Sequence, residues 1–149
     1  MKTISFLLFV ITMVFLVSQA QGTDWVSMGK DTDGTEVFYD SQTLTKLPTG
    51  IVKVWAKFQF SDEGRKDYIQ SQKLDVKRFE TLSHSLYLTE INCVTRETRT
   101  MAVTAYSTDG SVLHTFISKR QPPEGWDPVY PESMGKEMYK AVCPPQEKK

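Results

Sequence analysis

The chain has few of the residues that metal binding and redox catalysis use, since its 149 residues include only two histidines and two cysteines. His84 and His114 each lie in a predicted strand, and a zinc site would need further thiolate or carboxylate ligands. Cys93 and Cys143 do not form a Cys-x-x-Cys redox motif, and no nucleophile–base pair is visible in the sequence. We therefore expect no metal, no cofactor and no enzymatic activity.

An excess of one charge is lacking as well. The 18 basic and 18 acidic residues give a formal net charge of zero. Binding to nucleic acid would need a strong basic excess on one face, so this balance argues against a nucleic-acid partner.

Long apolar runs are limited to the first residues of the chain, at 4–17. This run is shorter than the ~20 residues that a membrane-spanning helix needs. Ser18 and Ala20 supply the small residues of a cleavage site, so we interpret residues 1–20 as a secretory signal peptide. The alternative is an uncleaved membrane anchor. Residues 21–149 are then expected to form a single domain that has one core and no membrane span.

The two cysteines of an exported chain indicate one disulfide, between Cys93 and Cys143. Cys93 ends a strand-like run, and Cys143 ends a short helical pattern just before Pro144. The bond would close a loop of about fifty residues and stabilise the fold by roughly 4 kcal/mol on the chain-entropy model. We expect it to tie a C-terminal helix to a sheet.

Alternation of apolar and polar residues predicts six strands. The clearest is 51–60, where Val52, Val54 and Ala56 fall on one face and Lys53 and Trp55 on the other. Turns of the Asp-Gly type separate two pairs of these runs. At the first turn, the sequence Asp31-Thr-Asp-Gly34 also resembles part of a calcium loop, although it lacks the later ligands. The other expected strands are 24–30, 36–40, 86–93, 96–106 and 112–118.

Two helices are expected beside these strands. The polar segment 62–82 lacks proline and carries apolar residues at imperfect helical spacing, which predicts a middle helix. A C-terminal helix should begin near Ser133, a good N-cap, and end before Pro144. Between strands and helix, Trp126 should anchor a proline-rich loop to the core. The fold class is therefore α+β: a mainly antiparallel sheet of about six strands, with the C-terminal helix packed on it and linked to it by the disulfide.

Four residues are candidates for binding another protein. Trp55 lies on the wetter face of its strand, where an exposed tryptophan can be a binding hot spot. The alternative is that a helix or a partner chain covers that face. Lys73, Lys77 and Arg78 form a small basic cluster, which is either an adhesive patch or a solvated helix face.

The order of several short motifs resembles the surface-adhesin protein E family. The resemblance covers nearly the whole chain after the signal peptide, and each motif is short. The motifs are Val-Lys-Val-Trp-Ala-Lys at 52–57, Glu-Gly-Arg at 63–65, Thr-Glu-Ile-Asn-Cys at 89–93 and Tyr-Lys-Ala-Val-Cys at 139–143. The Phe-Tyr-Asp at 38–40, the hairpin at Asp109-Gly110 and the Trp126 loop follow the same order.

The resemblance implies an antiparallel sheet with a C-terminal helix attached by a disulfide, and an assembly that can be a homodimer. It also implies surface adhesion in Gram-negative bacteria, with the host proteins vitronectin and laminin as ligands. Such an adhesin is held by a lipid on an N-terminal cysteine, and the first twenty residues here contain no cysteine. We therefore expect an exported, non-catalytic domain that binds a protein partner such as an extracellular-matrix protein, in the periplasm or at the cell surface. The alternative is a periplasmic envelope accessory protein that has no host ligand.

Overall fold

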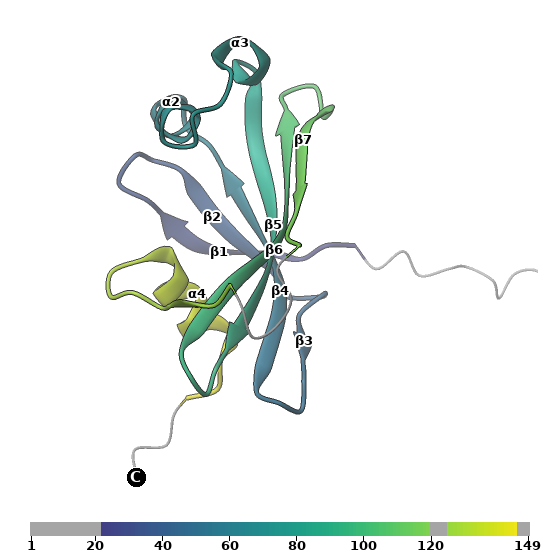
Figure 1. The fold of residues 1–149 in the computed structure, drawn as a ribbon, viewed down its shortest axis with the longest axis vertical. Coiled ribbons are helices and arrows are strands. Elements are labelled where there is room, and N and C mark those ends of the chain that lie inside the picture. Colours follow the sequence, from purple (N-terminus) through teal and green to yellow (C-terminus); the bar gives the residue numbers. More distant parts are fainter. Residues whose placement is uncertain (1–21, 120–124, 146–149) are drawn as a thin grey trace, which may run out of the picture.

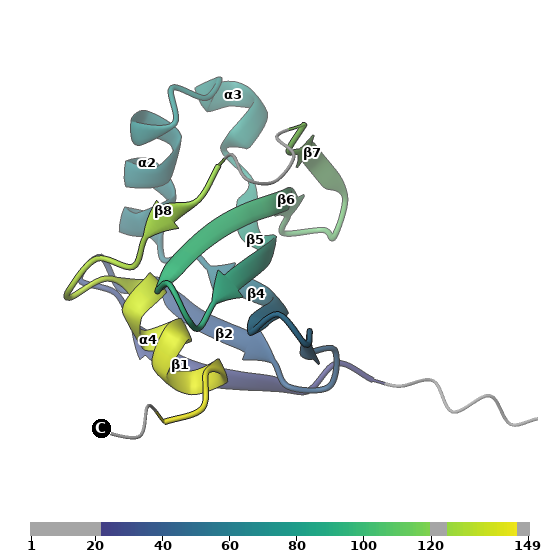
Figure 2. The same ribbon diagram turned by 60° about the horizontal axis from the view of Figure 1, so that its bottom comes forward.

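The described part of the chain forms one antiparallel sheet with three helices on it, shown in Figures 1 and 2. The structure is a computed structural model that describes residues 22–119 and 125–145. The expected signal peptide lies outside these residues. Six strands follow each other across the sheet in the order β1-β2-β4-β5-β6-β7, while β3 pairs with β4 and β8 pairs with β6. The α+β class and the antiparallel pairing are confirmed.

The strands agree with the expected ones to within a few residues, apart from an earlier start of β5. They are β1 Trp25–Lys30, β2 Glu36–Asp40, β3 Thr45–Lys46, β4 Ile51–Gln59, β5 Leu82–Asn92, β6 Glu97–Ser107, β7 Val112–Ile117 and β8 Asp127–Pro128. The two-residue strands β3 and β8 were not predicted, because their segments carry no alternation. Each extends the sheet locally, β3 beside Val52 and Lys53, and β8 beside Glu97 and Thr98.

The alternation along β4 separates a core face from a second face. Val52, Val54 and Ala56 are buried, and they contact Ile91 on β5 and the apolar side of helix α4. We call this side of the sheet the helix-covered face. Burial of such side chains is worth about 1.5–3 kcal/mol each, so this cluster supplies a large part of the stability.

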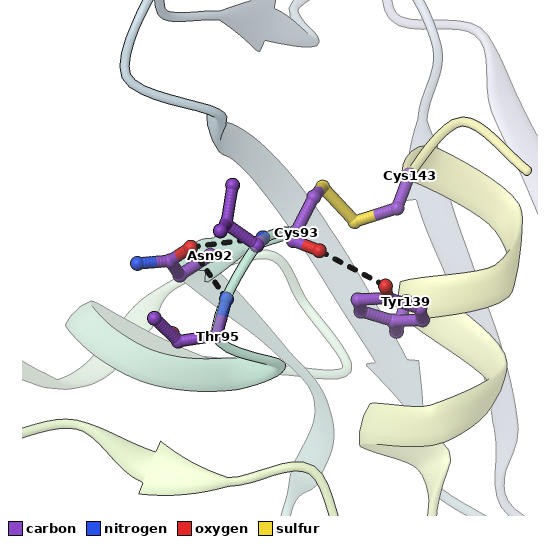
Figure 3. Close-up of a disulfide and its surroundings, with 6 residues drawn as sticks. Asn92, Cys93, Thr95, Tyr139 and Cys143 are labelled. Carbon is purple, nitrogen blue, oxygen red and sulfur yellow. Dashed lines mark hydrogen bonds between the residues drawn. A yellow bond between two sulfur atoms is a disulfide. The ribbon is translucent and has the colours of Figure 1, made fainter. Parts of the chain in front are cut away.

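Helix α4 (Met134–Val142) is docked on the helix-covered face by its apolar stripe and by the disulfide (Figure 3). Ser133 caps the helix by accepting a hydrogen bond from the Lys136 amide, as the sequence predicted. Cys143 follows the last turn, and its Cα lies 5.6 Å from that of Cys93. The Tyr139 hydroxyl donates a hydrogen bond of 3.0 Å to the Cys93 carbonyl. The expected disulfide between sheet and helix is confirmed.

The middle helical segment is broken, which corrects the single helix expected over 62–82. The structure has α2 (Asp62–Ser71) and the one-turn α3 (Val76–Phe79), and β5 already begins at Leu82. The Asp75 side chain accepts a hydrogen bond from the Arg78 amide and thereby starts a new helix. Both helices pack on the helix-covered face through a second cluster that includes Ile69, Phe79, Leu82 and Ala105.

The start of α2 is fastened to the first hairpin. The Ser61 hydroxyl accepts a hydrogen bond from the Gly64 amide and donates one to the Asp33 carbonyl. Gly64 is buried there, and a Cβ at this position would collide with the Thr35 hydroxyl. The Asp33 carboxylate accepts a hydrogen bond from the Thr35 amide, so this aspartate serves the turn. The position of α2 therefore depends on a residue without a side chain.

Reduction of the disulfide is expected to lower the free energy of unfolding by about 4 kcal/mol. The physical reason is that the unfolded chain regains the entropy that the crosslink removes over a sequence separation of 50 residues. Urea unfolding with and without a reductant measures the difference. An unchanged midpoint on reduction, or two thiols that alkylate in the untreated protein, would contradict this expectation.

Candidate protein-binding surface

The second face of the sheet carries Trp55 among side chains from neighbouring strands. In the register of the sheet, Trp55 lies opposite Leu88, and Lys57 lies opposite Leu86 and Phe38. These side chains are half-buried. The clusters around α2, α3 and α4 involve the opposite side of β4 and β5, so we call the Trp55 side the open face. Figure 1 shows α2 and α4 on the same side of these strands.

Lys57 connects two aromatic rings on the open face. Its ammonium nitrogen lies 4.6 Å from the centre of the Phe38 ring and 5.0 Å from that of the Trp25 ring. A cation over aromatic faces at these distances is attracted by the ring electrons, by about 0.5–1 kcal/mol at exposed sites. The open face therefore combines a positive charge with aromatic area, and aromatic residues are enriched in protein interfaces.

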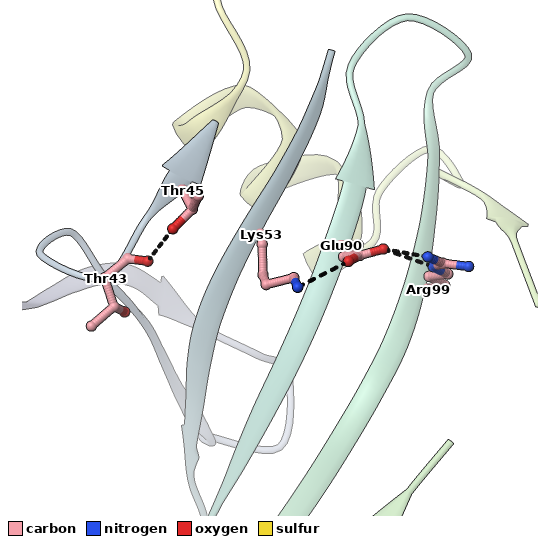
Figure 4. Close-up of polar contacts among 5 residues, drawn as sticks. All are labelled: Thr43, Thr45, Lys53, Glu90 and Arg99. Atoms are coloured by element: carbon pink, nitrogen blue, oxygen red, sulfur yellow. Dashed lines mark hydrogen bonds and ion pairs between the residues drawn. The ribbon is translucent and has the colours of Figure 1, made fainter. Parts of the chain in front are cut away.

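A row of charged side chains crosses three strands at the other end of the open face (Figure 4). Glu90 lies opposite Lys53 on one side and Arg99 on the other. One carboxylate oxygen of Glu90 accepts two hydrogen bonds, from Arg99 Nε at 2.8 Å and from Arg99 Nη2 at 2.6 Å. The other oxygen lies 3.3 Å from Lys53 Nζ. Only 7–8% of the Glu90 and Arg99 side chains is exposed, so the pair is removed from water and its members depend on each other.

Trp126, which directly precedes β8, lies over the Arg99 side chain. The Arg99 guanidinium carbon lies 4.6 Å from the centre of the indole ring, so Trp126 contacts a buried charged side chain of β6. Arg99 Nη1 is buried and has no hydrogen-bond partner among residues 22–119 and 125–145. This charged row was not predicted from the sequence. The β5–β6 hairpin could have indicated it, because its short turn places Glu90 opposite Arg99 once the register of the two strands is known.

The basic cluster lies at the corner between α2 and α3. Lys73 follows the end of α2, while Lys77 and Arg78 belong to α3, and all three are exposed. Arg78 is also used within the fold, since its Nη2 donates a hydrogen bond of 2.6 Å to the Leu113 carbonyl. The cluster is on the helix-covered side and Trp55 is on the open face. The predicted binding residues therefore do not form one site.

Other polar side chains serve packing. His84 stacks on Tyr106 with ring centres 4.9 Å apart, and burial together with the nearby Lys57 charge lowers the pKa of His84. His114 contacts the Phe79 ring at its edge, 6.4 Å between centres. Burial and the neighbouring Tyr68 hydroxyl raise the pKa of Tyr87. Within residues 22–119 and 125–145, no group of three or more histidine, cysteine or acidic side chains is arranged to hold a metal ion.

The fold and its surface define a class of protein: a disulfide-linked α+β domain with one side of its sheet covered by helices and an aromatic, partly charged open face. The family model of surface-adhesin protein E matches residues 25–144, and the chain belongs to this family. Membership indicates an adhesin-like, exported protein that binds protein partners. Comparison with curated proteins and with solved structures finds no match. Helices long and apolar enough to cross a membrane are absent from the described part of the chain.

Replacement of Glu90 by leucine is expected to lower the free energy of unfolding by about 3 kcal/mol or more, because it leaves the Arg99 charge buried and unpaired. Urea unfolding of the variant measures this loss.

The matched control is the double variant Glu90→Leu with Arg99→Met, which removes both charges. It should recover most of the lost stability, since apolar side chains can replace a buried ion pair at little cost. A double variant as unstable as Glu90→Leu alone would show that the pairing of Arg99 is not the cause.

Proposed function

We propose that this protein is an exported, non-catalytic domain that binds another protein through its surface, with an extracellular-matrix protein as the partner. The family match over residues 25–144 carries this proposal. Residues 1–20 act in it as a signal peptide that is removed, so that residues 21–149 are the working domain. The domain binds its partner in the periplasm or at the surface of a Gram-negative bacterium.

The open face around Trp55 is the first contact surface in this proposal. A half-buried tryptophan beside Lys57 offers a large apolar area at a fixed position on a strand. Rigid aromatic anchors of this kind carry much of the binding energy of protein interfaces. The corner with Lys73, Lys77 and Arg78 is a second and separate contact surface, and it adds charge.

A homodimer is part of the same proposal. Strand β7 forms the end of the strand order, and its residues Val112, Phe116 and Ile117 are 50–69% exposed. An edge strand with apolar side chains is a template for pairing with a further strand. A second copy of the chain could supply that strand.

Replacement of Trp55 by alanine is expected to weaken binding to immobilised matrix proteins at least tenfold, the change typical of an interface hot spot. The measurement is a titration of the purified domain on vitronectin-coated and laminin-coated surfaces over a salt series. The matched control is Phe60→Ala, which removes a half-buried ring packed with the α2–α3 cluster. Equal loss of binding in both variants, together with equal loss of thermal stability, would assign Trp55 to the core. Absence of saturable binding by the unmodified domain at low salt would reject the adhesive function.

Digestion of intact cells with a protease separates surface display from the periplasmic alternative. An adhesin at the surface is expected to be cleaved, whereas a periplasmic accessory protein is shielded by the outer membrane. Lysed cells serve as the control for intrinsic resistance to the protease. Full protection in intact cells, combined with cleavage after lysis, would favour an envelope role without a host ligand.

A further inference from the structure

A groove of about 360 Å³ lies along the corner between α2 and α3. Apolar side chains of Ile69, Leu74 and Val76 line it, together with Gln70, and two lysines, Lys66 and Lys73, belong to the same lining. Val76 is 68% exposed although it is aliphatic. The groove is therefore apolar inside and positively charged at its border, and no acidic side chain is part of its described lining.

The end of α2 places Lys73 at this border. The Leu74 amide donates to the Ile69 carbonyl at 2.9 Å, and the Lys73 amide donates to the Gln70 carbonyl at 3.1 Å. These two bonds are the pattern of a Schellman motif, in which the residue after the C-cap has a left-handed backbone. Leu74 packs against the cluster that contains Ile69, the kind of hydrophobic contact that frequently accompanies this motif. The same geometry therefore forms the apolar floor of the groove and orients its cationic border.

Glycine is the favoured residue at the position of Lys73. The φ angle of Lys73 is 52°, a left-handed conformation that disfavours residues with a Cβ. Arg96 has a similar φ of 59°, but its guanidinium lies over the Tyr139 ring. The Lys73 ammonium forms no ion pair with the described residues. The left-handed backbone of Lys73 thus closes α2, while its ammonium group has no charge partner among the described residues.

We propose that this groove binds a segment of the protein partner that carries a short apolar stretch flanked by carboxylates. The apolar stretch fills the space over Leu74 and Val76, and the carboxylates meet Lys66 and Lys73. Charge complementarity selects this occupant, because a basic segment would be repelled by the same two lysines. The inference rests on the proposed function as a protein-binding domain, and it specifies the chemistry of the partner at one place.

The test uses a fluorescent peptide, acetyl-Glu-Asp-Leu-Phe-Asp-Glu-amide, titrated with the purified domain and followed by anisotropy. Two reference peptides replace the acidic residues by Gln and Asn, or Leu and Phe by Ser. The acidic apolar peptide should bind with saturation, and binding should weaken as salt rises. Both reference peptides should bind at least about threefold more weakly, the loss expected from exposed ion pairs or a small apolar contact.

Lys73→Gly is the decisive variant, because its two effects should have opposite signs. Melting should shift upward by about 3–5 °C, since glycine relieves the left-handed backbone. Peptide affinity should fall about threefold, since one charge at the groove is lost. Val76→Ser should also weaken binding of the peptide, and it should leave the stability of the fold unchanged because Val76 is exposed. Lys46→Ala is the matched control, since it removes a lysine from β3, at the far end of the molecule in Figure 1.

Three results would overturn the groove as a binding site. They are equal affinity for the acidic peptide and its amide counterpart, unchanged affinity in Lys73→Gly, and equal loss in Lys46→Ala. The matrix-protein titration separates this failure from failure of the proposed function. If matrix proteins bind and the acidic peptide does not, only the groove inference is wrong. If the peptide binds and matrix proteins do not, the groove stands and the proposed partner is wrong.

Discussion

The docking of α4 on β4 and β5 is the interaction on which the rest of the structure depends. A helix of nine residues is too short to be stable alone in water, so α4 exists because its apolar stripe is buried. Cys143 follows directly after that stripe, and its partner Cys93 directly follows β5. Packing and crosslink therefore support each other: the docked helix brings the two sulfur atoms together, and the bond prevents the helix from leaving the sheet.

All three helices attach to the same face, and this leaves the open face to be stabilised by the strands themselves. Its interactions run across the strands at a fixed register, as in the row of Lys53, Glu90 and Arg99. Half-buried aromatic rings and a cation fill the remaining area near Lys57. A face held in this way keeps its shape without a covering layer. It can present side chains to another protein without first exposing the core.

Local rules predicted much of this fold, and long-range register explains what they missed. The period of two along β4 identified the buried side chains, and Ser133 marked the start of α4. The break after α2 was missed because Lys73 takes a backbone conformation that glycine usually signals. The pair of Glu90 and Arg99 was missed for a similar reason, since Arg96 takes a left-handed conformation in the turn that sets the register. Trp55 was placed on the correct side of its strand, but its distance from the basic cluster required the fold.

The two left-handed cationic residues show why stability alone does not account for this surface. At either position, a glycine would adopt the left-handed backbone conformation at a lower energetic cost. The Arg96 guanidinium lies over the Tyr139 ring, and the Tyr139 hydroxyl donates a hydrogen bond to the Cys93 carbonyl. The Arg96 side chain therefore stabilises the region around the disulfide. At Lys73 no such contact exists among the described residues, while an apolar groove lies beside it. The left-handed backbone at Lys73 ends α2, whereas its ammonium group is not used within the described fold and is free to meet a charge on a binding partner.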